Sequence, residues 1–415
     1  MSTRSPTPWV CAQLGSREHY AVPRVLRRSG RLRLLLTDYW TSPRGGATRL
    51  APGREAAKAA QRFHPDLVDA TVEHVGTRRL VFELWARVTR RTGWDTVLRR
   101  NALFQRVMLE RIRRNHESLL SESPGVFFAY SYAALGLLRK FKEAGWKTIL
   151  GQIDPGVREE EIVAAELARR PDLPSRWKRA PEHYWRAWRE ECDTCDRIMV
   201  NSEWSREALA QVGIAEGKID VVPLAFETPT MNTPRTLPTR FDHTRPLRVL
   251  FLGQLTVRKG VHLAIEAART MRSLPVHWTF VGPGDVDLPA DLLSAPFIRW
   301  SGAVSREETA RLYRESDVFL LPTLSDGFAL TQLEARACGL PVLASRFCGD
   351  VVRAGENGMI VDPLDTSGIV RVTTELVRSP ERVAAMSRIG PADERFSLEA
   401  LEARLVEMEE RLSRP

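Results

Sequence analysis

Residues 318–348 have the sequence VFLLPTLSDGFALTQLEARACGLPVLASRFC, which predicts a strand, a polar loop, a helix and a second strand. The apolar run Val318–Leu321 stops at Pro322, and a helix-compatible segment extends from about Ala329 to Gly339. Two strands joined through a helix run parallel in one sheet, as in a βαβ unit. We therefore expect an α/β protein built on parallel sheets.

Two acidic residues lie within this unit, Asp326 in the loop and Glu334 just over two turns into the helix. Both can point toward the carboxyl end of the first strand, where open parallel sheets bind ligands. The loop also leads into a helix N-terminus, whose free N–H groups and dipole favour a phosphate. Carboxylates beside a phosphate site bind hydroxyl groups, so the pair favours a sugar nucleotide. The alternative is an ordinary loop with two solvated acids.

The acid pair and its neighbours, in PTLSDGF, LTQLEA and ACGLPV, resemble the signature of retaining glycosyltransferases of family 4, the glycosyl transferases group 1. The resemblance covers almost the whole chain and is specific from about Asp196 to Asp362. It implies the GT-B fold, in which two doubly wound Rossmann-like α/β domains are followed by a C-terminal helix that packs back on the first. It also implies that a sugar moves, with retention, from a nucleotide-diphosphate sugar to a hydroxyl group of a glycan, lipid-linked or small-molecule acceptor. The implied reaction uses no metal ion or other cofactor and is typical of polysaccharide biosynthesis.

The resemblance assigns roles to residues of this unit. Glu334 should bond the ribose of the nucleotide, and Asp326 should bond hydroxyl groups of the donor sugar. Asp326 stands where most members carry glutamate, and Ala329 replaces a usual glycine, so the sugar pocket should differ in shape. The other residues of the loop that should bind the donor, largely through backbone N–H groups, are Gly327, Phe328 and Leu330.

A second phosphate-binding segment is predicted at Gly253–Gly260, GQLTVRKG, which follows a strand and opens a helix. Arg258 and Lys259 supply a guanidinium fork and a point charge, which suit a diphosphate that gains charge as the glycosidic bond breaks. The segment resembles a family element in which Lys259 matches a lysine and Gln254 replaces a common arginine. The alternative is a pair of surface charges at a helix start. The predicted catalytic residues are thus Asp326, Glu334, Lys259 and Arg258.

Two weaker signals follow neighbouring strands of the same half. Gly282 and Gly284, in GPGD, resemble the glycine turn that the family places near the nucleoside. Val304, in WSGAV, occupies the place where the backbone commonly meets the base. A nicotinamide-binding fingerprint would need three spaced glycines, which this stretch lacks.

The N-terminal half matches the family less closely. Many members carry a histidine after the strand that corresponds to Thr148–Gly151, but here Gln152 and Asp154 stand in that place. Either could replace the histidine in contacts to the transferred sugar. Gly15 and His19 lie in a polar loop after the first strand, and His19 could face the cleft. A purely structural histidine is the alternative.

Composition suggests where the domains divide. The segment 227–246 is rich in proline and hydroxyl side chains and has no apolar periodicity, which is typical of a linker. We therefore expect an acceptor-side Rossmann-like domain at 1–226, a nucleotide-sugar-binding domain at 247–394 and a returning helix at 395–415. The glycine-containing segment Thr41–Gly53 is predicted to be a mobile loop that can close over a ligand.

Length and hydropathy indicate a globular protein. The chain has 415 residues, 43% hydrophobic and 27% charged, which suits two or three domains. Its start lacks the apolar stretch of a signal peptide, and no run approaches the length of a membrane span. Five cysteines, two of them Cys192 and Cys195, suit a reducing compartment and buried thiols rather than a metal site. We expect a cytoplasmic protein, either free or peripheral on the inner face of the membrane.

The net charge of +9 indicates anionic partners, for which the resemblance favours nucleotide diphosphates and lipid headgroups over nucleic acid. The sequence is helical and basic from about residue 80 to 120, and residues 87–114 carry nine arginines against two acids. Such a segment predicts binding to an anionic bilayer. The alternative is a helix whose apolar face packs on the core and whose arginines are solvated. That apolar face is formed by Val97, Phe104, Met108 and Ile112.

Other functions are compatible with the same fold. A sugar phosphorylase or a nucleotide-sugar epimerase would use a similar nucleotide or phosphate site. A catalytically inactive partner of another transferase, which binds a nucleotide or a glycan, is favoured by Asp326 and by the missing histidine.

Overall fold

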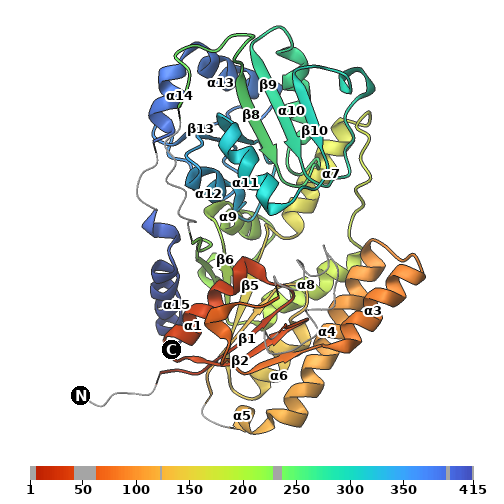
Figure 1. Cartoon of the computed structure of the whole chain (residues 1–415). Helices are drawn as coiled ribbons and strands as arrows, with labels where there is room; N and C mark the ends of the chain where they lie inside the picture. Colours follow the sequence, from red (N-terminus) through yellow and green to blue (C-terminus); the bar gives the residue numbers. More distant parts are fainter. Residues whose placement is uncertain (1–5, 42–61, 122–123, 228–235, 389–392, 414–415) are drawn as a thin grey trace.

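The computed structural model describes residues 6–41, 62–121, 124–227, 236–388 and 393–413, and Figure 1 shows two α/β units stacked one above the other. Of the loop expected at Thr41–Gly53, only Thr41 falls within these ranges, and residues 228–235 of the expected linker also lie outside them. In the figure the first unit lies below the second, and the last helix, α15, lies beside the first.

Within the described residues the first sheet has seven strands, all parallel, in the order β3-β2-β1-β4-β5-β6-β7. The strands are β1 Trp9–Gln13, β2 Leu32–Thr37, β3 Val72–His74, β4 Val126–Tyr130, β5 Lys147–Gln152, β6 Arg197–Val200 and β7 Ile219–Val221. The helices of this half are α1 Ala21–Arg28, α3 Thr77–Val88, α4 Trp94–Asn115, α5 Glu117–Ser121, α6 Leu135–Glu143, α7 Val157–Arg169, α8 Glu182–Thr194 and α9 Glu203–Gln211.

The second sheet has six parallel strands in the described part of the chain, in the order β10-β9-β8-β11-β12-β13. They are β8 Leu247–Leu252, β9 Val276–Val281, β10 Ile298–Ser301, β11 Val318–Leu321, β12 Val342–Ala344 and β13 Gly358–Ile360. The helices are α10 Val261–Thr270, α11 Arg306–Glu315, α12 Thr331–Ala337, α13 Thr366–Arg378, α14 Pro380–Met386 and α15 Leu398–Ser413.

The central strands are buried because helices cover both faces of each sheet. Every residue of β4, VFFAY, and of β11, VFLL, is buried. Parallel strands enclosed in this way read as continuous apolar runs rather than as alternating ones. The predicted strand–loop–helix–strand unit of residues 318–348 is therefore confirmed as β11, α12 and β12.

The last helix returns to the first domain, as expected. Leu401, Leu405 and Met408 of α15 pack in one apolar cluster with Trp9 of β1. The indole Nε1 of Trp9 also donates a hydrogen bond to Glu409 Oε2, 3.1 Å away. The chain thus returns to the first domain before α15.

Helix α7 differs from the expectation, because it lies in the N-terminal half of the sequence but packs on the second domain. Val163 belongs to the apolar core beneath the second sheet, and Figure 1 shows α7 beside the strands of that sheet. Glu166 Oε1 lies 3.1 Å from His262 Nε2 of α10. The expected linker also differs, since Phe241 is buried in the same core and Arg245 pairs with Asp317 through two contacts of 2.7 Å. Residues 241–246 are therefore part of the second domain.

The basic segment forms three helices, α3, α4 and α5, instead of one continuous stretch. The chain turns between α3 and α4 through Arg90 and Gly93, which both have positive φ angles. Phe104, Met108 and Ile112 of α4 are buried in the first core, because that helix lies over the sheet. The alternative interpretation, a core-facing helix with a solvated arginine face, is therefore the correct one for α4.

In the described ranges, no helix combines the length and the hydropathy that crossing a bilayer would need.

Candidate active site

The candidate site lies where the carboxyl ends of the two sheets meet. In the first sheet β1 and β4 are neighbours, so the loops that follow them diverge. In the second sheet β8 and β11 are neighbours, and the loops that follow them diverge in the same way. Open parallel sheets bind ligands at such points of reversal. The loop after β11 contacts the first domain at Ile153, just after β5. The two crevices are therefore close to each other.

The loops after β8 and β11 are joined by hydrogen bonds to one carbonyl group. The N–H of Leu324 donates to the carbonyl oxygen of Arg258 at 2.8 Å, and the Thr323 hydroxyl donates to the same oxygen at 3.1 Å. The segment that carries Arg258 and Lys259 is thereby fixed against the segment that carries Asp326. Both segments were predicted from the sequence, and the structure brings them together.

Asp326 is buried at this junction and contacts both cations. Lys259 Nζ contacts Asp326 Oδ2, and Arg258 Nη1 lies 3.1 Å from the same oxygen. Burial alone would raise the pKa of Asp326, but the attraction of Lys259 and Arg258 outweighs it and holds that pKa well below its usual range. The ionised carboxylate therefore holds two cations at the strand end where a diphosphate would meet them.

Glu159 is a further carboxyl group at this cluster, and it was not predicted from the sequence. Its Oε1 lies 3.5 Å from Arg258 Nε, because α7 begins beside the loop after β8. Burial raises the pKa of Glu159, with Arg258 opposing, and burial is also the main cause that raises the pKa of Asp154. Gln254 is exposed, and its Oε1 lies 3.5 Å from Arg258 Nη2. Carboxyl groups with raised pKa values in a cleft are typical of functional sites.

Glu334 and His19 come from different domains and lie near each other. Glu334 is half-buried on α12, and the Tyr313 hydroxyl donates a hydrogen bond to its Oε2 at 2.9 Å. Desolvation in the cleft and the charge of Arg306 lower the pKa of His19, while the charge of Glu334 opposes them. His19 itself is exposed on the loop after β1, so the expectation that it faces the cleft stays a prediction.

The loop after β11 is also held by the first domain. The indole Nε1 of Trp204, in α9, donates to Ser325 Oγ at 3.1 Å, and the Ser205 hydroxyl donates to the carbonyl oxygen of Gly327 at 3.4 Å. A Cβ atom on Gly327 would lie 2.1 Å from the carbonyl oxygen of Ile153. The two backbones approach so closely that only glycine fits at this position.

The glycine turn predicted near the nucleoside depends on close backbone contact. Gly282 has a φ of +142°, and a Cβ atom there would lie 1.7 Å from the carbonyl oxygen of Gly253. A Cβ atom on Gly284 would likewise lie 2.1 Å from the carbonyl oxygen of Leu255. Val304, expected near the base, is half-buried against the second domain. The loops after β8 and β9 therefore form one continuous backbone surface at the edge of the sheet.

One of the N–H groups that were predicted to bind the donor forms a hydrogen bond within the protein. The N–H of Phe328 donates to Asp326 Oδ1 at 3.1 Å, and its ring packs against Phe396 in the interior. This leaves Ala329 and Leu330 as the predicted N–H groups at the start of α12, which begins one residue later. Ala329 has a φ of +64°, which explains why glycine is usual at this position.

Gln152 and Asp154, the two candidates for the role of the missing histidine, are not equivalent. The amide Nε2 of Gln152 donates to Asp154 Oδ1 and to the Tyr132 hydroxyl, both at 2.9 Å. Its Oε1 accepts a hydrogen bond from Trp188 Nε1 at 3.0 Å. Gln152 is buried, and its amide fixes the position of Asp154. Of the two, Asp154 is the residue that lines the cleft.

The loop after β1 has a strained backbone. Glu18, His19 and Tyr20 have φ angles of 50°, 50° and 63°, a left-handed conformation that side chains other than glycine rarely adopt. Such strain clusters at functional sites, where the surrounding structure over-determines it. The N–H of Gly15 donates to Asp38 Oδ1 at 3.0 Å, which fixes the start of this loop.

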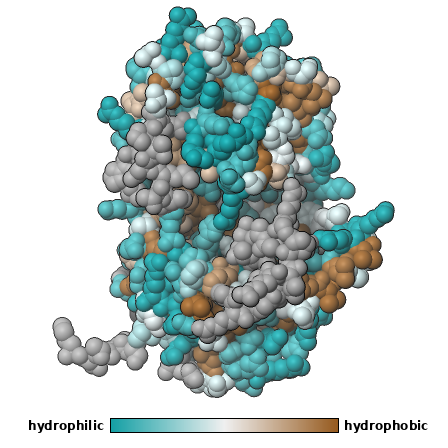
Figure 2. All heavy atoms as spheres, viewed as in Figure 1, coloured by the Kyte–Doolittle hydropathy of each residue, from teal (hydrophilic) through white to brown (hydrophobic). Residues whose placement is uncertain are grey.

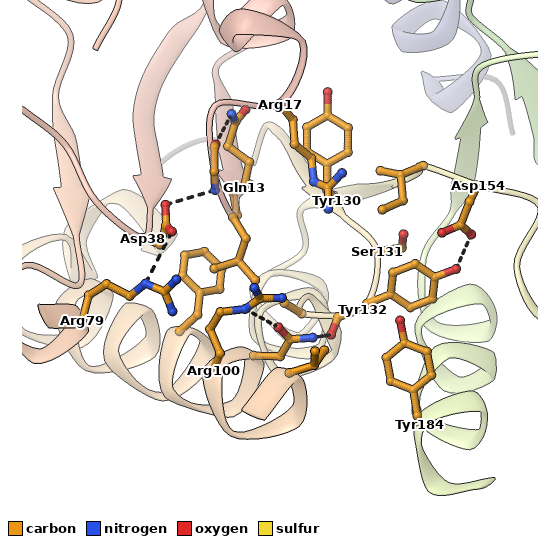
Figure 3. Close-up of a pocket in the computed structure, with 18 of the residues that line it drawn as sticks. Gln13, Arg17, Asp38, Arg79, Arg100, Tyr130, Ser131, Tyr132, Asp154 and Tyr184 are labelled. Carbon is orange, nitrogen blue, oxygen red and sulfur yellow. Dashed lines mark hydrogen bonds and ion pairs between the residues drawn. The ribbon is translucent and has the colours of Figure 1, made fainter. Parts of the chain in front are cut away.

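A cavity of about 240 Å³ opens between the loops after β1 and β4 (Figure 3). Gly15 and Asp154, which were predicted from the sequence, line it. Most of its other residues were not predicted as site residues, although some follow a strand, which is the signal that could have found them. Others come from helices α3, α4 and α8, which only tertiary packing brings to this place. These additional residues include Arg17, Asp38, Arg79, Arg100, Tyr132 and Tyr184.

Metal ligands and reactive thiols are two further kinds of group that could carry chemistry. In the ranges that the structure describes, no group of three His, Cys, Asp or Glu side chains is arranged to hold a metal ion. Cys192 and Cys195 are buried free thiols, and burial raises the pKa of Cys195 to about 12. A thiol of this kind is a poor nucleophile.

Comparison with known proteins adds a family match. Residues 246–379 match the family described as Glycosyl transferases group 1. The MMP alpha-(1->4)-mannosyltransferase of Mycolicibacterium hassiacum is 30% identical over 266 residues, which cover 61% of this chain and 62% of that protein. The chain spans between 50% and 62% of the length of the first curated relatives that it matches.

Solved structures resemble the chain over nearly its whole length. The sucrose-phosphate synthase of Thermosynechococcus elongatus has a TM-score of 0.65 at 15% identity, with 98% of this chain and 99% of that chain covered. The HepE protein of Anabaena, solved in complex with UDP and glucose, has a TM-score of 0.58 at 14% identity, with 98% and 100% covered. These likenesses confirm the expected fold, with its two doubly wound domains.

Proposed function

We propose that this chain, which has the GT-B fold, is a retaining glycosyltransferase of the glycosyl transferases group 1 and uses a nucleotide-diphosphate sugar as donor. The observation that carries the proposal is the convergence of Arg258 and Lys259 on Asp326 at the point of reversal of the second sheet. The UDP bound in the Anabaena HepE structure supports a nucleotide as the donor's leaving group. The names of curated relatives support sugar transfer as the reaction.

In this proposal the nucleotide diphosphate binds at the start of α10, where Arg258 and Lys259 exchange part of their contact with Asp326 for phosphate oxygens. The bond between the anomeric carbon and the phosphate oxygen breaks, and its electron pair stays on the phosphate. The two cations stabilise the charge that develops there. Because they supply this charge stabilisation, we propose that the reaction needs no metal ion.

The acceptor binds in the crevice of the first domain, on the opposite wall of the cleft. Its hydroxyl oxygen forms the new bond to the anomeric carbon on the face that the diphosphate leaves, so the configuration is retained. A leaving phosphate oxygen takes the proton of the hydroxyl. The protein contributes chiefly by orienting the two substrates between the domains.

The donor class can be tested by thermal stability and by transfer. We expect one nucleotide-diphosphate sugar in a panel to raise the melting temperature, since a ligand that binds the folded state stabilises it. The same donor should lose its sugar to a hydroxyl acceptor, with the anomeric configuration of the product determined by NMR. Nucleotide binding without transfer to any acceptor would instead indicate an inactive binding protein, and inverted product would refute retention.

Glu334→Gln should weaken binding or turnover of the donor about 10- to 100-fold, the equivalent of roughly 1.5–3 kcal/mol for a charge-assisted hydrogen bond to ribose. The fold should persist, because glutamine can still accept the hydrogen bond from Tyr313. Steady-state kinetics with the identified donor measure the effect. Glu307→Gln, an exposed acid of α11, is the matched control and should behave as wild type. Unchanged kinetics in Glu334→Gln would contradict the assigned role.

We also propose that the outer face of α3, rather than α4, contacts an anionic bilayer. The guanidinium groups of Arg91 and Arg99 stand over the Trp85 ring, 5.2 and 5.6 Å from its centroid, so cations border this face. Figure 2 shows hydrophobic residues gathered at the edge of the molecule where α3 lies. An apolar helix face bordered by arginines is complementary to anionic lipid headgroups. The exposed apolar side chains are Leu80 at 53%, Val81 at 66%, Leu84 at 62% and Val88 at 74%.

Cosedimentation with phosphatidylcholine vesicles that contain phosphatidylglycerol tests this surface. Wild type should pellet at low salt, and less so as salt rises, because the attraction decays within a Debye length. Changing Leu84→Gln and Val88→Gln together should leave the protein in the supernatant. Leu293→Gln, an equally exposed leucine of the second domain at 67%, is the matched control and should pellet as wild type does. Equal pelleting of the double variant would contradict the proposal.

A further inference from the structure

The cavity between the loops after β1 and β4 has an unusual charge balance. Its wall carries two carboxylates, Asp38 and Asp154. Asp38 already forms two ion pairs, since Arg62 Nη1 lies 2.8 Å and Arg79 Nε lies 3.8 Å from its carboxylate oxygens. Asp154 accepts hydrogen bonds from the Tyr132 hydroxyl and from backbone and amide groups. Four arginines line the same wall: Arg17, Arg62, Arg79 and Arg100.

Arg17 and Arg100 have no carboxylate within ion-pair distance among the described residues. Arg17 lies over the Tyr130 ring, with its guanidinium carbon 5.7 Å from the centroid. Arg100 Nε lies 3.4 Å from the neutral side-chain oxygen of Asn101. Burial and the nearby charges of Arg79 and Arg17 lower the pKa of Arg100, while the charges of Asp38 and Glu83 oppose them. Two half-buried cations of the described chain therefore face one cavity without a carboxylate at ion-pair distance, which is unfavourable unless an anion binds.

Several buried polar atoms at this cavity have no hydrogen-bond partner within the described part of the chain. They include Gln13 Oε1 and Ser131 Oγ, whose residues are only 2% and 5% exposed. The others are Arg17 Nε and one terminal nitrogen of Arg79, Nη1. Buried polar groups are normally bonded, and each exception needs an explanation. Because the residues that carry these atoms all line the same cavity, one polar ligand there could satisfy several of them (Figure 3).

We propose that this cavity binds the phosphate group of an anionic acceptor, with Arg17 and Arg100 as its principal ligands. The inference rests on the proposed glycosyltransferase function and names the chemical class of its acceptor. Arginine presents a planar fork that matches phosphate oxygens, and the Ser131 hydroxyl and Arg79 add further donors.

The neighbouring residues fit the neutral part of such an acceptor. Tyr132 and Tyr184 stack with their ring centroids 5.0 Å apart and form an aromatic wall, as a sugar or polyol ring requires. Asp154, at the side of the cavity nearest Arg258, can accept a hydrogen bond from an acceptor hydroxyl. The phosphate would thus anchor the acceptor at the arginine side and direct a hydroxyl group toward the donor.

Two sources could present this phosphate: a soluble sugar phosphate, or a lipid headgroup at a membrane. The probes are therefore glucose 6-phosphate, with glucose as its neutral counterpart, and vesicles of phosphatidylcholine with or without phosphatidylglycerol. Binding is measured by calorimetry with the sugars and by cosedimentation with the vesicles. UDP binding is measured on the same samples, so a failed acceptor site can be told apart from a failed donor site.

We expect Arg17→Gln and Arg100→Gln each to lower the affinity for the phosphate-bearing probe about tenfold or more. Each variant should keep its UDP affinity. Its melting temperature should stay equal to that of wild type or rise, because an uncompensated cation has been removed. A merely structural arginine would lower the melting temperature instead. Arg106→Gln, an exposed arginine of α4, is the matched control and should bind the probe as wild type does.

The results of these binding measurements distinguish a soluble phosphate ester from a lipid headgroup as the source of the phosphate. A response to glucose 6-phosphate but not to glucose, lost in the two variants, supports a soluble phosphate ester. A response confined to vesicles with phosphatidylglycerol, and lost in the same variants, supports a lipid headgroup. The proposal would be overturned if the variants retained the response, or if glucose gave an equal response. It would also be overturned if neither phosphate probe gave a response while UDP still bound.

Discussion

Lys259→Ala should lower the turnover number about 100- to 1,000-fold. A loss of this size is typical when an enzyme loses one preorganised group that stabilises a developing oxyanion. The affinity for the donor should fall much less. The diphosphate is more negative in the transition state than in the bound sugar nucleotide, so a cation at this position contributes more to the rate than to ground-state binding. Steady-state and single-turnover kinetics with the identified donor measure the two effects separately.

Loss of Lys259 also changes its partner Asp326, which must be controlled for. With one cation removed, burial of the carboxylate is less compensated, so the pKa of Asp326 should rise and the melting temperature should fall. Asp326→Asn combined with Lys259→Met removes both charges and should restore stability but not turnover. Arg269→Ala, which breaks an exposed ion pair between α10 and Asp291, should leave the turnover number and the melting temperature near those of wild type. An effect of Lys259→Ala confined to KM would refute its role in the transition state.

The donor side of the site could be predicted from the sequence because each of its parts is local. Arg258 and Lys259 follow one strand within a few residues, and Asp326 follows another. Parallel strands end at the same edge of a sheet, so finding the strands was enough to bring these loops together. The structure bears out that placement through the direct contacts between the two loops.

The acceptor side could not be predicted in this way. Arg17 and Tyr132 meet because β1 and β4 pair, although more than one hundred residues separate them in the sequence. Glu159 reaches Arg258 because α7 packs on the second domain, and no local pattern distinguishes that helix from one that covers the first sheet.

For a related reason the sequence left two interpretations of the basic segment open. Both α3 and α4 have apolar side chains at helical spacing and arginines between them, so periodicity alone cannot tell which apolar face is buried. Phe104 of α4 lies in the core, whereas Leu84 of α3 is exposed. Only the packing of the two helices against the first sheet decides between these outcomes.

The close approach of the domains makes Gly327 a sensitive position for catalysis. Its α-carbon lies against the backbone of Ile153, and an added Cβ atom would lie 2.1 Å from that carbonyl oxygen. Gly327→Ala therefore forces the loop after β11 and the first domain apart. The neighbouring contacts from Trp204 to Ser325 and from Ser205 to Gly327 span the same junction and should lengthen with it.

Gly327→Ala should therefore lower the transfer rate about 100-fold, since a displacement of roughly 1 Å between reacting groups can cost that much. UDP affinity should change little, because the diphosphate contacts of Arg258 and Lys259 lie within the second domain. Gly302→Ala is the matched control, as a Cβ atom there meets nothing within 4 Å, and it should transfer as wild type does. If Gly327→Ala loses UDP affinity and transfer in equal measure, the loop itself has been damaged. If it transfers normally, this contact between the domains has no part in aligning the substrates.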